Sequence, residues 1–251
     1  MPKLIILGSA SPLSDEAHES THMVLQGEMD TILIDCVNNP LWRLQKVGID
    51  FNRLTGLLVT HFHPDHVSGV PTLLVNMWLL GRTAPLNIYG LEHTLESVES
   101  LMFAYQLKSL DHFYPIFLRP VAEREQASVF ESDEFRITAS PVCHFLPTIG
   151  LRIESLQSKK VLAYSCDTEP CPRVVGLAQD VDVLIHEAGG PGPGHSSAAQ
   201  AGAIARQAAA RRLYLIHYRA WGFDPLPLVA QAQQEYSGPV ALAEDFLEIV
   251  F

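Results

Sequence analysis

The stretch LLVTHFHPDHVSG, residues 57–69, joins a short apolar run to a dense cluster of histidine and aspartate. Four ligand-type residues fall within six positions of it: His61, His63, Asp65 and His66. Neutral imidazole and ionised carboxylate are good ligands for zinc, iron or manganese. A lone histidine is most simply a structural or surface residue, but four such side chains on one turn favour a metal site. The stretch therefore predicts part of a metal centre at the end of a buried strand.

Three more apolar runs end in the same kind of residue. His144 follows ITASPVC, Asp167 follows VLAYSC, and His217 follows LYLI. Any one of them could equally be an ordinary structural residue, but the repetition of a strand followed by a ligand weakens that alternative. Seven ligands with one shared carboxylate would suit two metal ions about 3.5–4 Å apart, which is the spacing of two-metal hydrolase sites.

The spacing of apolar residues predicts short strands and helices along the whole chain. Strands are expected at residues 3–7, 22–25, 31–35, 57–60, 86–89, 119–121, 127–129, 135–141, 150–155, 161–165, 183–186, 213–217, 240–243 and 248–251. Helices are expected at residues 39–47, 70–80, 91–114, 196–210 and 225–236. Strands mostly precede helices in each half, so sheets covered by helices fit better than a barrel or a helical bundle.

The composition is that of a globular protein. The chain has 251 residues, 47% of them hydrophobic, which suits a single α/β domain spanning residues 1–251. No apolar run reaches the roughly 18 residues that a transmembrane helix needs, so no membrane partner is expected. The four cysteines form no CxxC pair and indicate reduced thiols in a cytoplasmic protein. The formal net charge of −11 disfavours an extensive nucleic-acid interface, because phosphate contacts need clustered Lys and Arg.

The His-x-His-x-Asp-His pattern of residues 61–66 resembles the signature of the metallo-β-lactamase superfamily, and the later ligand candidates follow in the order of its later motifs. The resemblance covers nearly the whole chain and implies an α/β fold, the αββα four-layer sandwich. By this resemblance the first metal would be bound by His61, His63 and His144, the second by Asp65, His66 and His217, and both by Asp167. Asp35, at the end of TILID, matches a motif aspartate that hydrogen-bonds behind the metal-site loop. The alternative interpretation is that Asp35 is an ordinary aspartate at the end of a strand.

Two further segments are similar to the ribonuclease Z branch of that superfamily. They are His186-Glu187-Ala188, and Gly194-His195-Ser196-Ser197 at the start of an expected helix. By this resemblance His195 would donate a proton to the leaving group or hold a phosphate oxygen, and Glu187 would orient a catalytic histidine. The alternatives are a helix cap or loop residue for His195 and a structural carboxylate for Glu187.

The chain also departs from that branch. Ribonucleases Z carry a long inserted arm that grips tRNA, in the common bacterial form between the third-motif histidine and the bridging aspartate. Here one short hairpin separates His144 from Asp167, which leaves no room for such an arm. The usual bridging motif is Ser-Gly-Asp-Thr, whereas residues 165–168 read Ser-Cys-Asp-Thr. These departures disfavour RNA as a partner and favour a small ester or phosphodiester.

The expected activity is that of a dinuclear metal-dependent hydrolase, most simply a phosphodiesterase or related ester hydrolase in which a hydroxide bridging two metals is the nucleophile. Asp65 would hold or accept the proton of that water. Two divalent ions are the expected cofactors, zinc first, with manganese or iron compatible. Two alternatives stay open: a ribonuclease Z-type endonuclease that processes tRNA 3′ ends, and a non-catalytic metal-binding sensor or scaffold. Relatives are often dimers, so a homodimer is compatible.

Overall fold

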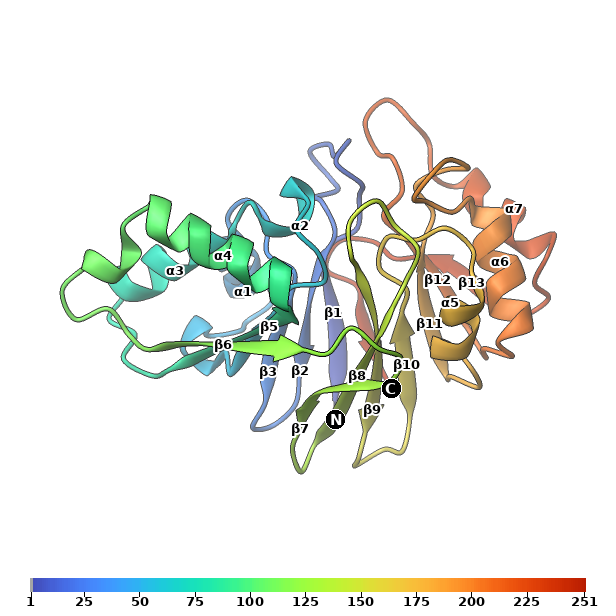
Figure 1. The fold of residues 1–251 in the computed structure, drawn as a ribbon. Helices are drawn as coiled ribbons and strands as arrows, with labels where there is room; N and C mark the ends of the chain where they lie inside the picture. The colour runs from blue at the N-terminus through green and yellow to red at the C-terminus, as the bar shows by residue number, and fades with distance from the viewer. Residues whose placement is uncertain (1) are drawn as a thin grey trace.

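The computed structural model describes residues 2–251 and contains two seven-stranded sheets that face one another (Figure 1). In spatial order, the first sheet consists of β14 (Glu248–Val250), β1 (Lys3–Gly8), β2 (His22–Gln26), β3 (Thr31–Ile34), β4 (Gly56–Leu58), β5 (Leu86–Leu91) and β6 (Ile116–Val121). The second consists of β13 (Val240–Leu242), β12 (Leu213–Ile216), β11 (Val183–Glu187), β10 (Val161–Tyr164), β9 (Ile149–Ser155), β8 (Phe135–Pro141) and β7 (Ala127–Glu131).

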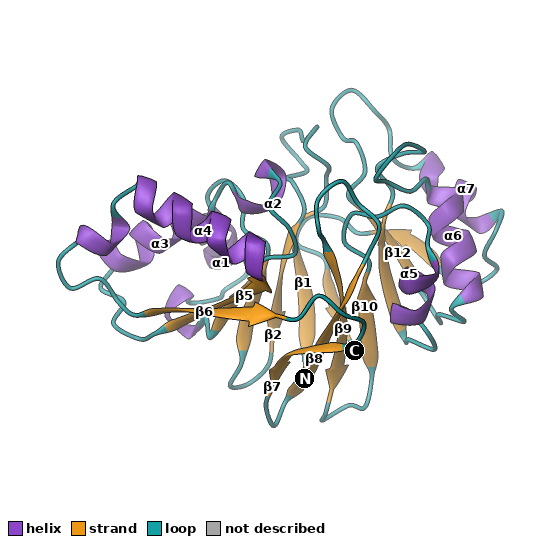
Figure 2. Ribbon diagram, viewed as in Figure 1, coloured by secondary structure: helices purple, strands orange, loops and turns teal. Residues whose placement is uncertain are grey.

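Helices cover the outer face of each sheet (Figure 2). Those packed on the first sheet are α1 (Pro40–Lys46), α3 (Val70–Leu79) and α4 (Glu92–Ala104). Those packed on the second are α5 (Pro172–Leu177), α6 (Ala198–Gln207) and α7 (Pro227–Gln233). The single-turn helix α2 (Pro64–Val67) and the 3₁₀ turns η1 (Phe51–Arg53) and η2 (Leu107–Ser109) lie in connections. This arrangement confirms the predicted αββα sandwich.

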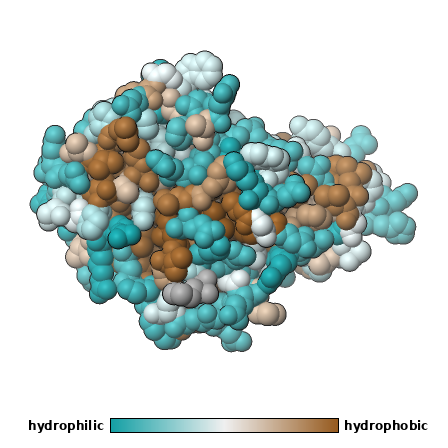
Figure 3. All heavy atoms as spheres, turned by 180° about the vertical axis from the view of Figure 1, so that it is seen from behind, coloured by the Kyte–Doolittle hydropathy of each residue, from teal (hydrophilic) through white to brown (hydrophobic). Residues whose placement is uncertain are grey.

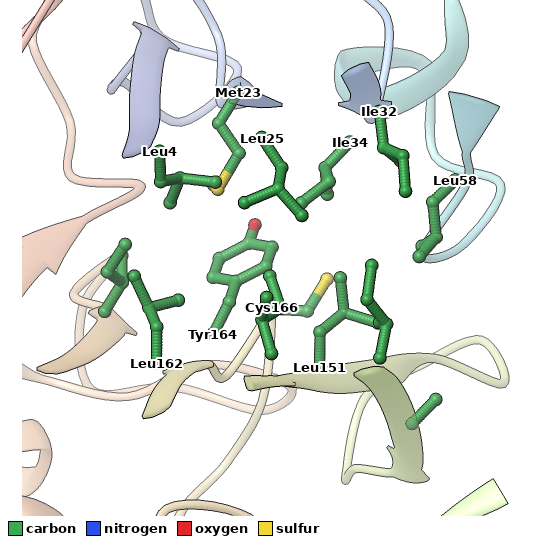
Figure 4. Close-up of a cluster of buried hydrophobic side chains, with 14 of the residues drawn as sticks. Leu4, Met23, Leu25, Ile32, Ile34, Leu58, Leu151, Leu162, Tyr164 and Cys166 are labelled. Atoms are coloured by element: carbon green, nitrogen blue, oxygen red, sulfur yellow. The ribbon is translucent and has the colours of Figure 1, made fainter. Parts of the chain in front are cut away.

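The space between the sheets is the central hydrophobic core. Successive residues of a strand point to opposite faces, so Leu4 and Ile6 of β1 enter this core, whereas Ile5 and Leu7 pack against the helices. Figure 4 shows Leu4 and other side chains of the first sheet pointing toward Leu162 and neighbouring side chains of the second. Because both faces of β1 are buried, its sequence after Lys3 is apolar throughout, without polar alternation.

The expected helix at residues 91–114 is wrong in its second half. The observed helix α4 ends at Ala104, and Gln106 then adopts a left-handed backbone conformation with φ of 53°. A left-handed residue cannot continue a right-handed helix, so the chain turns there although apolar residues continue at helical spacing. The other expected helices are observed, with ends that differ by at most three residues.

The carboxyl ends of the central strands of both sheets meet at one edge of the sandwich. The pairs β3–β4, β10–β11 and β11–β12 are parallel, and β8 runs in the same direction as β10 because both are antiparallel to β9. Loops that follow these strands therefore converge, which is where binding sites form in α/β sheets.

The outer surface carries apolar side chains. Seen from behind in Figure 3, apolar atoms gather in several patches that hydrophilic atoms surround. Within residues 2–251, no helix is long and apolar enough to cross a membrane.

Candidate metal centre

Every predicted ligand residue lies at the edge where the carboxyl ends of the strands converge. His61 follows β4, Asp167 follows β10, His217 directly follows β12, and His144 lies in the loop after β8. The remaining three lie at the start of α2: His63 is the N-cap of this helix, and Asp65 and His66 are in its single turn. Pro64 at the first helical position starts this helix, which was not expected from the sequence. Both sheets thus contribute side chains to one site.

The first group of ligand atoms comes from three histidines and Asp167. Nδ1 of His63 lies 3.0 Å from Nε2 of His61 and 3.0 Å from Nε2 of His144. Nε2 of His61 and Nε2 of His144 lie 3.8 and 3.9 Å from Oδ2 of Asp167. Ligands bound tetrahedrally to one zinc ion at 2.0–2.1 Å would lie about 3.3 Å apart. The spacing in this group is therefore that of ligands around one ion.

The second group shares the same carboxylate oxygen. Nε2 of His217 lies 3.3 Å from Oδ2 of Asp65 and 3.3 Å from Oδ2 of Asp167. Nε2 of His66 lies 3.6 Å from Oδ2 of Asp65 and 3.4 Å from Oδ2 of Asp167. In each group the four ligand atoms all lie within 4.8 Å of one another. Oδ2 of Asp167 is thus shared by the two groups.

The polar atoms inside the site fit a bound cation. Nε2 of His66 and Oδ1 of Asp167 are buried and have no hydrogen-bond partner among residues 2–251. A buried polar atom without a partner costs about 1–3 kcal/mol, so such atoms usually have a ligand. The site combines imidazole and carboxylate donors, which suits divalent metals such as zinc.

Hydrogen bonds behind the ligands fix their orientation. Asp35 accepts from the backbone N–H and the hydroxyl of Thr60, at 2.8 and 2.8 Å, and its Oδ2 lies 2.8 Å from Nδ1 of His66. The predicted contact of Asp35 behind the metal-site loop is therefore present. Nδ1 of His144 lies 2.7 Å from the Gly194 carbonyl oxygen, to which it can donate. Such outer contacts select the ring nitrogen that is free to bind a metal.

Thr60 and Gly194 were not identified from the sequence. Thr60 has a detectable signal, because it precedes His61 at the end of a strand and its hydroxyl can reach a neighbouring strand end. The carbonyl of Gly194 has none, since a backbone acceptor leaves no mark in the sequence. Gly194 itself has a φ of +75°, which explains why glycine is found there.

Burial and neighbouring charges shift the pKa values of the side chains in the site. Burial lowers the pKa of His61 well below its usual value. Burial also disfavours protonated His66, but Asp167 and Asp35 outweigh it and raise the pKa of His66. Burial would raise the pKa of Asp167, yet His217 and His66 hold it well below its usual range. The buried carboxylates thus need positive charge around them, which metal ions can supply in place of protons.

His195 and Glu187 form a pair beside both ligand groups. Nδ1 of His195 lies 3.0 Å from Oε1 of Glu187, and this hydrogen bond raises the pKa of His195 despite partial burial. The His195 ring centroid is 5.0 Å from that of His144 and 5.5 Å from that of His217. The side chain of Glu187 is fully buried, whereas that of His195 is 29% exposed. The buried carboxylate therefore holds an accessible imidazole at the mouth of the site.

Cys166 lies beside His61 and His66, and these three side chains form a further group that could hold a metal ion. Its Sγ lies 3.6 Å from Nδ1 of His61, the ring nitrogen that faces away from Asp167. Burial raises the pKa of the Cys166 thiol well above its usual value, so the metal-binding thiolate is disfavoured. Its φ of 54° is a left-handed conformation, in which glycine is normally favoured.

The segment between His144 and Asp167 is a short hairpin. Between His144 and Asp167 the chain consists of a short loop, strands β9 and β10, and the turn at residues 156–160 that joins them. The antiparallel pairing of the two strands is continuous from Glu154 with Val161 to Leu151 with Tyr164. The hairpin therefore contains no additional element.

Comparison with known proteins agrees with this fold. A family model described as the β-lactamase superfamily domain matches residues 30–218, which is more than half of the chain. The chain belongs to the β-lactamase superfamily. The matched region begins just before β3 and ends just after His217, so it includes both ligand groups.

Relatives place this superfamily member in the ribonuclease Z-like group. Ribonuclease Z of Mycolicibacterium gilvum is 31% identical over 197 residues, which cover 74% of this chain and 68% of the relative. Ribonuclease Z of Methanothermobacter thermautotrophicus is 24% identical over 303 positions, covering 99% of this chain and 96% of the relative. The crystal structure of human tRNase Z, short form, has a TM-score of 0.80 at 23% identity, covering 100% of this chain and 98% of that one.

These relatives define the class of activity. This superfamily member is a metal-dependent hydrolase, and its fold implies bound divalent metal ions. The alternative of a non-catalytic sensor is therefore set aside. The alignment with the Methanothermobacter enzyme is longer than this 251-residue chain, so the relative has segments that this chain lacks.

Proposed function

We propose that this protein hydrolyses phosphodiesters with two divalent metal ions and that both ions are zinc in the native protein. In this proposal the ligands are His61, His63 and His144 for the first ion, Asp65, His66 and His217 for the second, and Asp167 for both. The observation that carries the proposal is the convergence of two four-membered ligand groups on a single oxygen, Oδ2 of Asp167. Five imidazoles and two carboxylates suit zinc, and the same set is compatible with manganese or iron.

Bound divalent ions at this site would activate water and stabilise negative charge on phosphoryl oxygens. The proton transfers would be carried out by side chains of the protein. The side chain of Asp65 is 11% exposed; burial would raise its pKa, but His217 and His66 lower it, so the ionised carboxylate is suited to accept the proton of the attacking water. His195 would donate a proton to the leaving oxygen, because its hydrogen bond to Glu187 raises its pKa and so favours the protonated imidazole.

Both sheets are needed for this activity. The first sheet supplies the turn at residues 61–66, and the second supplies His144, Asp167 and His217. Neither half has a complete ligand set, so we propose that residues 1–251 act as a single hydrolase domain. The four cysteines are all free thiols, which supports a reducing compartment such as the cytoplasm.

A ribonuclease that processes tRNA 3′ ends is the second candidate. The names of the relatives favour it, because ribonucleases cleave phosphodiester bonds of RNA. The formal net charge of −11 and the short hairpin between His144 and Asp167 favour a smaller substrate. The two candidates share one metal centre and differ in what surrounds it.

Metal analysis and turnover of bis(p-nitrophenyl) phosphate test the first candidate. We expect two metal ions per chain and turnover that a chelator abolishes. Asp65→Ala removes a proposed ligand and is expected to lose metal and nearly all turnover. Asp133→Ala is the matched control, because Asp133 is an exposed aspartate in the turn before β8, at the opposite edge of the sheet.

A parallel assay with precursor tRNA separates the two candidates. Cleavage of the 3′ trailer at one position, at a higher kcat/KM than for any small diester, would favour the ribonuclease. No turnover of any phosphodiester by protein that holds two metal ions would refute both.

A further inference from the structure

An aromatic side chain lies exposed at the mouth of the proposed metal centre. Phe145 follows His144 directly and is 64% exposed. Its ring centroid is 5.2 Å from that of His144 and 6.4 Å from that of His195. Exposed phenylalanines are ordinary on protein surfaces, but this one borders both a proposed ligand and the proposed proton donor.

The loop holds the Phe145 ring in a fixed place. The ring packs against Gly194 so closely that a methyl group on the Gly194 Cα would lie 2.6 Å from Cε2 of Phe145. The adjacent backbone is anchored, since Cys143 N–H donates to the Thr168 hydroxyl at 3.1 Å and Glu169 N–H donates to the Cys143 carbonyl at 2.8 Å. A ring held in this way loses little conformational freedom when it binds a ligand.

Because Phe145 lies beside His195, its ring would contact the part of a substrate that lies near His195. A proton donor must lie within hydrogen-bond reach of the leaving oxygen, so the leaving group departs on the His195 side. Phe145 borders that side and offers an apolar surface that gains from being covered. We propose that Phe145 forms one wall of a leaving-group subsite and that the preferred leaving group carries an aromatic ring. This inference rests on the proposed phosphodiesterase function.

The test uses the full metal-loaded chain and two diesters that differ in the leaving group. Methyl 4-nitrophenyl phosphate carries its only ring on the leaving group, and dimethyl phosphate, used as a competitive inhibitor, has none. Phe145→Ala is expected to raise KM for the first about three- to tenfold and to leave the Ki of dimethyl phosphate unchanged. Phe145→Tyr keeps the ring and is expected to keep the wild-type KM.

Phe103→Ala is the matched control, because Phe103 is 82% exposed on α4, on the helical layer of the first sheet. It is expected to change neither constant. An unchanged KM in Phe145→Ala, or an equal rise in the Ki of dimethyl phosphate, would overturn the subsite while leaving the phosphodiesterase proposal intact. If the wild-type protein hydrolyses neither methyl 4-nitrophenyl phosphate nor bis(p-nitrophenyl) phosphate, the proposed function is overturned, and the subsite with it.

Discussion

Replacing Glu187 with glutamine tests the pair that holds the proposed proton donor. Oε1 of Glu187 accepts from the backbone N–H groups of Thr168 and Ser196, at 3.1 and 3.0 Å, and lies 3.0 Å from Nδ1 of His195. Oε2 accepts from Gly189 N–H at 2.7 Å. Glutamine has the same shape but only one acceptor oxygen. If that oxygen replaces Oε1, the amide NH₂ faces the Gly189 N–H, and one hydrogen bond becomes a contact between two donors.

The structure sets the size of the expected loss. Hydrogen bonds to a charged group contribute about 1.5–3 kcal/mol, against about 0.5–1.5 kcal/mol for neutral pairs. Losing one bond and weakening the others therefore destabilises Glu187→Gln by roughly 2–4 kcal/mol, which lowers Tm by about 5–15 °C. Because general acid catalysis contributes about 10²–10⁴-fold, kcat is expected to fall about 10- to 100-fold when His195 is retained but no longer held by a carboxylate.

The pH profile separates this role from a purely structural one. The hydrogen bond to Glu187 raises the pKa of His195, and the proton donor is active only when protonated. With a leaving group that needs a proton, such as an unsubstituted phenol, kcat falls as pH rises through this pKa. In Glu187→Gln the pKa of His195 decreases, so the fall begins at lower pH. With 4-nitrophenolate, which leaves without protonation, the shift is expected to be small.

Glu96→Gln, an exposed position on α4, is the matched control and is expected to keep the wild-type profile. Identical pH profiles for the wild type and a folded Glu187→Gln protein would refute the reasoning. So would an equal shift for both leaving groups, since that would indicate a change at the nucleophile.

Three other outcomes are expected. Asp35→Asn cannot accept from Thr60 and His66 together, so metal affinity measured by chelator competition should fall about 10- to 100-fold. The Tm of metal-free protein should decrease as pH rises above 6.5. Burial opposes protonation of His66, but Asp167 and Asp35 raise its pKa, so deprotonation of His66 removes a charge interaction that stabilises the fold. The Tm of metal-loaded protein should decrease less. Tyr164→Phe removes a buried hydroxyl that lacks a hydrogen-bond partner among the described residues, so urea unfolding should show equal or up to about 1 kcal/mol greater stability.

The residues that converge at the proposed metal centre could be picked out from the sequence because the fold confines them to strand ends. A buried strand such as β4 or β12 is apolar along its whole length, so a histidine at its carboxyl end stands out. Parallel strands bring those ends to one edge, and the order of the motifs then indicates which ends meet. What the pattern could not give is which ring nitrogen faces the site, because that depends on acceptors such as the Gly194 carbonyl.

Element ends were harder to predict than the elements themselves. The helix expected at residues 91–114 ends before Gln106, whose backbone is left-handed although glutamine is a good helix former. The exposed ring of Phe145 had no sequence signal either. Its exposure depends on how closely the loop at residues 142–148 approaches Gly194, which is a tertiary contact.

A left-handed backbone occurs at three strand ends of the edge where the two sheets converge. Asp35, Cys166 and His217 have φ values of 57°, 54° and 56°, and each follows a strand of the converging edge directly or by one residue. A left-handed non-glycine residue costs about 1–2 kcal/mol, so each turn must be offset by other contacts. His217 N–H donates to the Ser9 carbonyl at 2.7 Å, and Asp35 N–H donates to the Leu58 carbonyl at 2.8 Å. Cys166 is instead offset by burial of its side chain in the core between the sheets (Figure 4), which explains why this chain keeps the turn without the glycine usual before a bridging aspartate.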